Sequence, residues 1–371
     1  MQKFKIFLIA GEESGDINAF AVMNELKKLV DFRLYGTGGE KLQSLNQLQY
    51  FDIKEMEIIG IDGVFRKLPF VIKMFYSLKK RIDEIKPDVV IMVDYPGFNI
   101  IFAKTVKMMG YPVIYYIAPQ VWAWHSSRVK KIKKYVDLLL CILPFEEQFF
   151  KNNMINAKYV GNPLTERITP LFEDKKNFYN SVGLNMSKKT IGILPGSRTK
   201  EVKNLLPDIV KVADVLSDQY QFVLGKAGSV GKELIMNYIK NTNIKLVKDG
   251  TYDIMNFSDL LWICSGTATL EAGIIQTPMI IFYKTGLITE FLGRIFVKLR
   301  YIGLPNIILD KEAVPELIGK DVNQKNIIFH TRQLLSMKEK VVEDLSKISN
   351  LFSERRSSLI AAKEIYSFLS K

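Results

Sequence analysis

Asp94 stands at the end of an apolar run, DVVIMV (88–93), and is followed by YPGFN. Burial raises the pKa of a carboxyl group at such a position, which suits it to accept a proton near neutral pH. The pattern therefore predicts a general base. The same side chain could instead cap a helix predicted over 97–109, and the sequence leaves both interpretations open.

Polar residues also follow the N-terminal apolar run, FKIFLIA (4–10). Glu12 is a candidate catalytic residue, and Ser14 is a candidate substrate ligand. Ser14 and the nearby Asp16 are also residue types that cap the N-termini of helices. A cap on the first helix is therefore the alternative role for both.

The segment LPGSRTKE (194–201) is suited to bind a phosphate. Gly196 allows a tight turn, and Ser197 and Arg198 then stand at a helix start, where backbone N–H groups and the helix dipole favour an anion. Arg198 would add a bidentate contact and is a candidate for charge stabilisation in catalysis. The alternative is a helix cap with a surface arginine.

The segment CSGTATLEAG (264–273) opens another predicted helix with Ser265, Gly266 and Thr267. Glu271 lies one turn further along, on the same helix face as Thr267. Here the helix start would hold a diphosphate, and the carboxylate would accept hydrogen bonds from two ribose hydroxyls. A helix cap with a solvated glutamate is the alternative.

These candidates need elements that bring them together. Short apolar runs alternate with amphipathic stretches, which predicts strand–helix units and parallel sheets. Several runs are apolar at every position, as is typical of strands covered by helices on both faces. The predicted strands are 4–10, 32–36, 88–93, 112–117, 137–143, 190–194, 221–225, 259–264 and 278–283.

The predicted fold class is α/β, with two Rossmann-like, doubly wound parallel-sheet domains and an interdomain cleft. We expect an N-terminal domain over 1–165, a C-terminal domain over 166–345 and a C-terminal helix, 346–371, that packs back on the N-terminal domain. A polar stretch around 165–188 is predicted to be a linker. In such sheets, ligands lie at the carboxyl ends of the strands.

Because residues just after strands face the ligand in such folds, several more become candidate substrate ligands. One group lies in APQVWAW (118–124), whose tryptophans suit a core role and a ligand role equally. The lysines of the following RVKKIKKYVD (128–137) are predicted to lie on the solvated face of a short helix. The candidate substrate ligands after strands are Asn99, Gln120, Trp122, Trp124 and Asn306.

The charge of the chain points to an anionic partner. Its 371 residues carry a formal net charge of +13, and residues 61–134 hold 14 Lys/Arg against 5 Asp/Glu. Nucleic acid, anionic lipid and phosphorylated small molecules all remain open on this ground.

Metal and disulfide chemistry are not expected. Cys141 and Cys264 lie in apolar runs and predict buried thiols, while His125 and His330 stand far apart. The chain has no D-x-D spacing, and GKAGSVGKE (225–233) departs from a Walker loop in its glycine spacing and in the Glu that follows the Lys. We expect no metal and no cofactor.

A membrane surface is predicted for GVFRKLPFVIKMFYSLKKR (63–81). Its apolar residues at helical spacing are interleaved with arginine and lysine, a composition suited to an anionic leaflet. A core helix is the alternative. The chain has no apolar stretch of about 18–20 residues that could span a bilayer, so any association would be peripheral. The predicted acyl or membrane contacts are Phe65, Leu68, Phe70 and Phe75.

Several stretches together resemble the lipid-A-disaccharide synthase family. The longest is YYIAPQVWAWHSSRVKKIKKYVDLLLCILPFE (115–146), and the resemblance covers roughly residues 4–320. The other matching stretches are IAGEESGD, GTGG, KPDVVIMVDYPGFN, YVGNPL, LPGSRTKEV, SGTATLEA and YIGLPNIILD.

The resemblance implies an inverting, metal-independent GT-B glycosyltransferase. The family joins UDP-2,3-diacylglucosamine to 2,3-diacylglucosamine 1-phosphate, giving the β-1,6-linked lipid A disaccharide 1-phosphate and UDP. Asp94 would then deprotonate the acceptor. The N-terminal domain would face acceptor and membrane, and the C-terminal domain would hold the UDP-sugar. The expected location is the cytoplasmic face of an anionic inner membrane, with a possible homodimer through the C-terminal helices and no nucleic-acid partner.

Two positions depart from the commonest family pattern. Gly97 stands where some members have Asp, and Asn162 replaces a frequent His, which puts proton transfer at that position in doubt. Two other functions stay open. One is a UDP-sugar-dependent GT-B enzyme with a different lipid acceptor, and the other is a non-catalytic basic protein that binds membrane or RNA.

Overall fold

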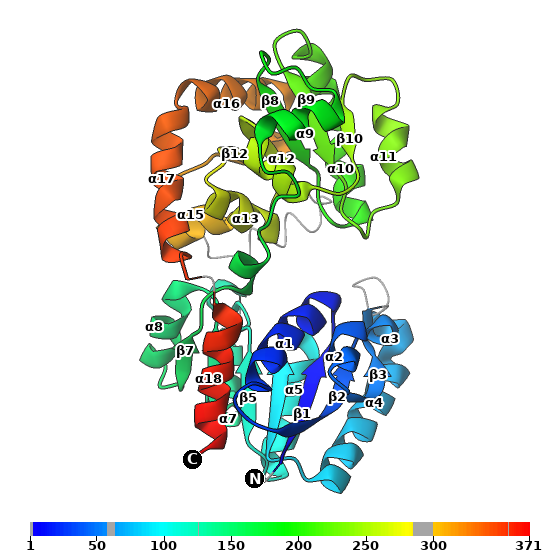
Figure 1. Cartoon of the computed structure of the whole chain (residues 1–371), viewed down its shortest axis with the longest axis vertical. Helices are drawn as coiled ribbons and strands as arrows, with labels where there is room; N and C mark the ends of the chain where they lie inside the picture. The colour runs from blue at the N-terminus through cyan, green and yellow to red at the C-terminus, as the bar shows by residue number, and fades with distance from the viewer. Residues whose placement is uncertain (1–2, 58–63, 125, 285–299, 355) are drawn as a thin grey trace. The chain divides into compact units, whose positions relative to one another are not determined.

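The structure is a computed structural model that describes residues 3–57, 64–124, 126–284, 300–354 and 356–371, with the backbone alone at 57, 64–68, 123–124 and 126–127. The chain divides into two compact units (Figure 1). The first unit combines Met1–Pro163 with Glu354–Lys371, and the second is Leu164–Ser353.

The first unit contains a seven-stranded sheet in the order β3-β2-β1-β4-β5-β6-β7, and every neighbouring pair is parallel. Its central strands are apolar and fully buried, because helices cover both faces. The strands are β1 Phe4–Ala10, β2 Phe32–Gly38, β3 Leu48–Asp52, β4 Val89–Val93, β5 Val113–Tyr116, β6 Leu138–Cys141 and β7 Ala157–Tyr159.

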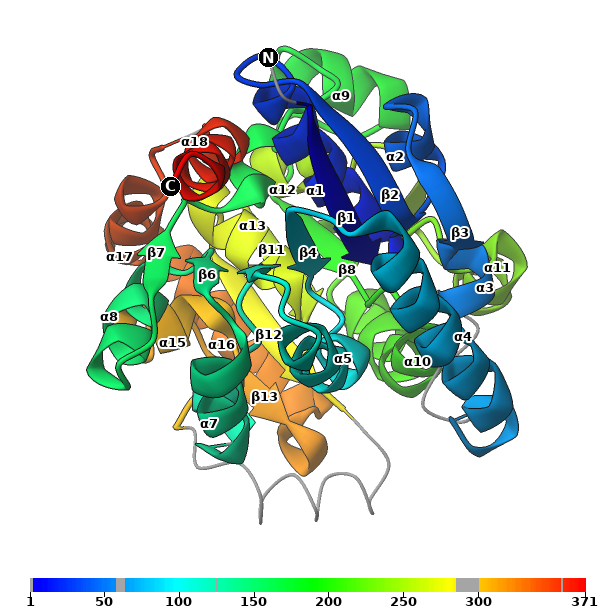
Figure 2. The ribbon, with the colours of Figure 1, turned by 90° about the horizontal axis from the view of Figure 1, so that it is seen from below.

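Two hydrophobic clusters fill the two faces of this sheet. Figure 2 shows α4, α5 and α7 on one side of the sheet and α1, α2 and α18 on the other. α18, from the end of the chain, packs against α1. The helices are α1 Glu13–Leu26, α2 Glu40–Ser44, α3 Ile53–Glu57, α4 Val64–Ile85, α5 Pro96–Met108, α6 Val121–Trp124, α7 Ser126–Tyr135, α8 Pro144–Asn152 and α18 Ser357–Leu369.

The second unit contains a six-stranded parallel sheet in the order β10-β9-β8-β11-β12-β13. In both sheets, the first strand of the unit lies inside the sheet and the strand order reverses beside it, between β1 and β4 and between β8 and β11. The strands are β8 Thr190–Leu194, β9 Gln221–Gly225, β10 Lys245–Val247, β11 Leu260–Cys264, β12 Met279–Tyr283 and β13 Glu316–Ile318.

The helices of the second unit follow its strands in the doubly wound pattern. α10 contacts α11 and α16, whereas α13 contacts α12, α15 and α17. The helices are η2 Pro163–Glu166 at the unit boundary, α9 Lys175–Val182, α10 Thr199–Val215, α11 Lys232–Ile239, α12 Thr251–Phe257, α13 Thr267–Ile275, α15 Leu304–Leu309, η3 Gly319–Asp321, α16 Gln324–Ser336 and α17 Lys338–Leu351.

The linker predicted around 165–188 is wrong in part. Helix α9 lies within it and buries Phe178 and Tyr179 completely. Asp174 caps this helix by accepting from the backbone N–H of Asn177, and Gly183 ends it in the left-handed conformation. The stretch is polar apart from a few residues, so its composition did not indicate a short helix that is held by two buried aromatic side chains.

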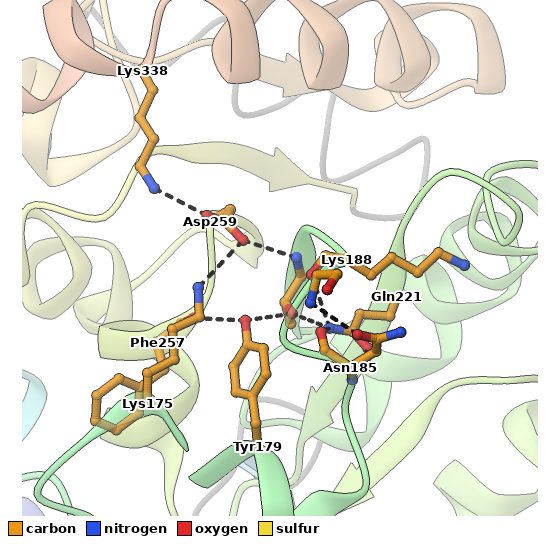
Figure 3. Close-up of polar contacts among 10 residues, drawn as sticks. Lys175, Tyr179, Asn185, Lys188, Gln221, Phe257, Asp259 and Lys338 are labelled. Carbon is orange, nitrogen blue, oxygen red and sulfur yellow. Dashed lines mark hydrogen bonds and ion pairs between the residues drawn. The ribbon is translucent and has the colours of Figure 1, made fainter. Parts of the chain in front are cut away.

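A polar network ties the amino ends of β8, β9 and β11 together (Figure 3). Asp259 accepts from the backbone N–H of Thr190 at 3.0 Å and from Lys338 Nζ at 3.1 Å. The Thr190 hydroxyl in turn bonds the Tyr179 hydroxyl at 2.6 Å and Gln221 Nε2 at 2.8 Å. The network lies at the amino ends of these strands, whereas ligands of such sheets bind at the carboxyl ends. We therefore assign the network a role in the stability of the second unit.

Candidate active site

Asp94 and Glu12 meet at the point where the strand order of the first sheet reverses. Ala10 of β1 is paired with Val93 of β4, so the residues that follow these two strands emerge side by side. Ligands of doubly wound sheets bind at this switch point. Sequence reasoning placed both carboxylates after strands, and the structure brings them together.

The environment of Asp94 tunes its protonation. The pKa of its carboxyl group is raised to about 6, chiefly by burial and then by the nearby negative charge of Glu12, while a hydrogen bond from the Tyr95 backbone opposes both. A carboxylate with this pKa is ionised at neutral pH and still basic enough to accept a proton. Helix α5 is not capped by Asp94, because its N-cap residue is Tyr95.

Gly11 and Asp16 have structural roles beside these carboxylates. A Cβ at Gly11 would lie 2.6 Å from the Tyr95 ring, so the close approach of this ring requires glycine. The buried Asp16 accepts from the backbone N–H groups of Gly39, Lys41 and Leu42 at 2.7–3.2 Å. It therefore caps α2 and not its own helix.

Ser14 lies exposed in the first turn of α1, and Gln120 is exposed before α6. Trp122 is half-buried, packs edge-on against Phe145 and donates from Nε1 to Glu146 at 3.0 Å. The Trp124 side chain lies outside the described residues. Trp122, on α6, is thus engaged with residues of its own unit.

Glu146 is a buried carboxyl group that sequence reasoning missed. Burial raises its pKa to about 7, and hydrogen bonds from Trp122 and from the backbone of Leu143 and Ile142 oppose that rise. Glu146 is the third residue of α8, but the N-cap residue Leu143 has no polar side chain, so the sequence carried no capping-box signal for it.

Two predicted substrate ligands, Asn99 and Asn306, are fully buried. Asn99 donates to the backbone carbonyls of Val93 and Asp94. Asn306 donates to Glu316 and accepts from two backbone N–H groups in the loop before β13. These placements fit supporting roles better than direct substrate contact.

In the second sheet, the phosphate candidates lie after β8 and β11, the strands at its own switch point. Gly196 has a φ of 118°, which favours glycine, and α10 begins at Thr199. Glu201 folds back on this helix start and accepts from the N–H groups of Ser197 and Arg198 at 3.0 and 3.1 Å. It also accepts from Arg198 Nη1 at 2.9 Å.

The Arg198 side chain is 80% exposed, so it is free to reorient toward an anion. A phosphate at this helix start would have to displace the Glu201 carboxylate. The charges of Arg198 and Glu201 both act on the Cys264 thiol, whose pKa is raised chiefly by burial. Cys264 ends β11, so the two phosphate candidates lie close together.

Helix α13 begins directly after this point. Ser265 is half-buried, Gly266 and Thr267 are exposed, and Gly266 has a φ of 153°. Glu271 accepts from the Tyr252 hydroxyl at 2.9 Å. Burial raises the pKa of Glu271, while the bond from Tyr252 and the charge of Arg167 oppose the rise.

The structure describes the side chains of two of the four predicted acyl or membrane contacts. Phe70 packs against Phe51 and Phe75 against Phe102, and both are partly buried side chains that pack against the core cluster. The side chains of Phe65 and Leu68 lie outside the described residues. The exposed large hydrophobic residues on the described part of α4 are Ile72, 46% exposed, and Tyr76, 65% exposed. None of the described helices is both long enough and apolar enough to cross a bilayer.

Two solved structures with a similar fold are a nucleotide-sugar epimerase and a glycosyltransferase. A UDP-GlcNAc 2-epimerase from Neisseria meningitidis, bound to UDP-GlcNAc, aligns with a TM-score of 0.67 at 15% identity over 99% of both chains. The calicheamicin glycosyltransferase CalG4 aligns with a TM-score of 0.66 at 12% identity over 100% of this chain and 99% of that one. The fold is therefore of the GT-B class.

Sequence comparison identifies the family within this class. A sequence model of the lipid-A-disaccharide synthetase family matches residues 6–366. The lipid-A-disaccharide synthase of Myxococcus xanthus is 33% identical, over 98% of this chain and 97% of that protein. Lipid-A-disaccharide synthase 1 of Legionella pneumophila is 31% identical, over 95% and 94%. The chain belongs to the lipid-A-disaccharide synthetase family.

Proposed function

We propose that this protein transfers the sugar of UDP-2,3-diacylglucosamine to 2,3-diacylglucosamine 1-phosphate, giving the β-1,6-linked lipid A disaccharide 1-phosphate and UDP. Family membership supports the reaction class. The observation that carries the chemistry is Asp94, a carboxylate with a pKa of about 6 at the switch point of the first sheet.

In the proposed reaction, the acceptor 6-hydroxyl oxygen attacks the anomeric carbon of the donor. The bond from that carbon to the UDP oxygen breaks, UDP leaves with the electron pair, and Asp94 takes the hydroxyl proton. A single displacement inverts the anomeric centre. Glu12 assists by keeping Asp94 basic, because its negative charge disfavours a second charge nearby.

The leaving diphosphate is assigned to the second unit. Arg198 and the helix start at Ser265–Thr267 would stabilise the charge that grows on UDP as the bond breaks. Glu271 would bind the ribose hydroxyls. The chain carries no D-x-D spacing for a divalent cation, so we assign charge neutralisation to these protein groups.

Membrane association is proposed for the first unit. Ile72 and Tyr76 are exposed on α4 next to the exposed Lys73, Lys79 and Lys80. An apolar pair among lysines suits peripheral binding to an anionic leaflet, where each basic residue contributes about 1 kcal/mol. The proposed location is the cytoplasmic face of the inner membrane. A homodimer through the C-terminal helices also remains a proposal, which light scattering can test.

The test is a reconstituted reaction analysed by mass spectrometry. Purified protein, UDP-2,3-diacylglucosamine and 2,3-diacylglucosamine 1-phosphate are incubated with EDTA present, in parallel with an acceptor that lacks the 1-phosphate. We expect the disaccharide 1-phosphate and an equal amount of UDP. Turnover that requires added divalent cation in place of EDTA would overturn the metal-independent mechanism. Absence of product both with EDTA and with added divalent cation would overturn the proposed reaction.

A further inference from the structure

Asp94 and Tyr95 form a left-handed turn between β4 and α5. Their φ angles are 46° and 48°, in a region that residues other than glycine rarely adopt. Such conformations cost on the order of 1–3 kcal/mol per residue and persist only where the surroundings hold them. The strain lies at the residue proposed as the base, so the contacts that hold it are of functional interest.

Two side chains donate to the backbone carbonyl of Asp94. The Tyr115 hydroxyl lies 2.6 Å from this oxygen and Asn99 Nδ2 lies 2.8 Å from it. The backbone N–H of Asp94 donates to the carbonyl of Tyr116 at 2.9 Å. The main chain of Asp94 is thus fixed from β5 and from α5 at once.

Both donors are fully buried, and Asn99 also donates to the carbonyl of Val93 at 3.3 Å. Burial raises the pKa of Tyr115 well above its ordinary value, and the charge of Asp94 adds to the rise, so the hydroxyl stays protonated and donates. Among the described residues, the Oδ1 atom of Asn99 has no hydrogen-bond partner. An unpartnered buried acceptor costs about 1–3 kcal/mol, a cost that an apolar side chain would avoid.

We propose that Tyr115 and Asn99 are positioning residues that hold the Asp94–Tyr95 turn and so direct the Asp94 carboxylate toward the acceptor hydroxyl. The inference rests on the proposed function, in which Asp94 is the base. Neither residue is exposed to substrate. Each acts through the main chain of Asp94, as a sharp strand-to-helix turn does when it presents a catalytic side chain.

The first test separates kcat from KM. Tyr115→Phe and Asn99→Leu are each expected to lower kcat by about 10- to 100-fold, because a displacement near 1 Å at a reacting group has an effect of this size. The KM for the UDP-sugar should not change, since its proposed ligands lie at the starts of α10 and α13 in the second unit. Tyr116→Phe is the matched control, because it removes the same hydroxyl from the next residue, whose ring packs on the opposite face of the sheet.

The second test is the pH dependence of kcat. Relaxing the turn lets the Asp94 carboxylate gain water, so its pKa falls from about 6 toward its ordinary value and the acid limb of kcat moves to lower pH. The charged groups that act on this site are Glu12 beside Asp94 and Arg128 near Tyr115, and neither changes in the variants. A role confined to stability would leave the limb in place.

The outcomes distinguish the inference from the function on which it rests. Lower kcat with a shifted acid limb supports positioning. Wild-type kcat and an unshifted limb in both variants, with Asp94→Asn inactive, overturn positioning and leave the base assignment intact. Wild-type kcat in Asp94→Asn overturns the base assignment itself. If Asn99→Leu does not fold, Tyr115→Phe decides alone, because it keeps the ring and removes one oxygen.

Discussion

At the residue scale, the proposed chemistry depends on how burial and a neighbouring charge set the pKa of Asp94. Burial is the largest cause of its raised pKa and Glu12 is the second. The two carboxylates come from different strand ends, so their coupling follows from the topology of the sheet. A protonated Asp94 cannot accept a proton, so kcat should fall as the pH drops through about 6.

The Glu12 charge provides the first prediction. Glu12→Gln removes a like charge next to Asp94, so the pKa of Asp94 falls and the acid limb of kcat moves to lower pH. Glu13→Gln is the control, because it removes the same charge one residue further along. A pH profile of kcat for both variants checks this, and an unmoved limb in Glu12→Gln would disprove the coupling.

The ribose contact provides the second prediction, also at the residue scale. Glu271→Ala should weaken UDP binding by about 10- to 100-fold, since a hydrogen bond to a charged group is worth about 1.5–3 kcal/mol. Glu233→Ala, at the exposed start of α11, should leave the affinity unchanged. Calorimetric titration with UDP measures both, and equal affinities for the two variants would remove Glu271 from the site.

At the element scale, backbone N–H groups at the start of α10 already donate hydrogen bonds to Glu201, a carboxylate of the same helix. Glu201 takes two backbone N–H groups and the Arg198 guanidinium, so it occupies the donors that the sequence pattern assigned to a phosphate. A diphosphate would compete with this capping carboxylate for the same donors. The sequence PGSRTKE shows the pattern of an anion site but no capping box, because Arg198 and not a serine or threonine stands at the N-cap position.

This competition gives the third prediction. Glu201→Gln keeps a capping acceptor and removes the negative charge, so UDP should bind more tightly while the melting temperature changes little. Glu201→Ala also removes the cap and should lower the free energy of unfolding by about 1 kcal/mol. Calorimetry and urea denaturation measure these effects. Weaker UDP binding in Glu201→Gln would mean that the carboxylate belongs to the binding site.

The exposed face of α4 gives the fourth prediction, at the same scale. Replacing Ile72 and Tyr76 together by Ser should reduce co-sedimentation with anionic vesicles and leave UDP affinity unchanged. High salt should weaken wild-type binding without abolishing it, because buried apolar area is not screened.

The matched control for the membrane test is Phe329→Ser, which removes a 60% exposed aromatic from α16 in the second unit. It should sediment as the wild type does. Equal sedimentation of the α4 variant and the wild type would place the docking surface elsewhere, with the basic helix α7 as the next candidate.

At the scale of the whole molecule, the sequence predicted the interior strands and missed those at the edges. The apolar runs at 4–10, 190–194 and 221–225 match β1, β8 and β9 residue for residue. The missed strands β3, β7, β10 and β13 end the two sheets, and they are short and partly exposed. Edge strands need no continuous apolar run, so their sequences carry no such signal.

The same reasoning applies to the site. The strand-end rule singled out Asp94, Arg198 and Glu271 as candidates, because it depends only on where strands end. It could not find the bond from Tyr115 to Asp94 or the bond from Trp122 to Glu146, which join residues 21 and 24 positions apart. Such contacts depend on how neighbouring strands and loops pack, which no local pattern encodes.

The most direct test of the central claim is kcat of Asp94→Asn in the reconstituted disaccharide reaction. Asparagine tolerates the left-handed backbone and keeps the shape of the side chain, so the variant should fold and bind UDP as the wild type does. Loss of the general base should lower kcat by about 10²–10⁴-fold. A folded Asp94→Asn protein with wild-type kcat would contradict the account.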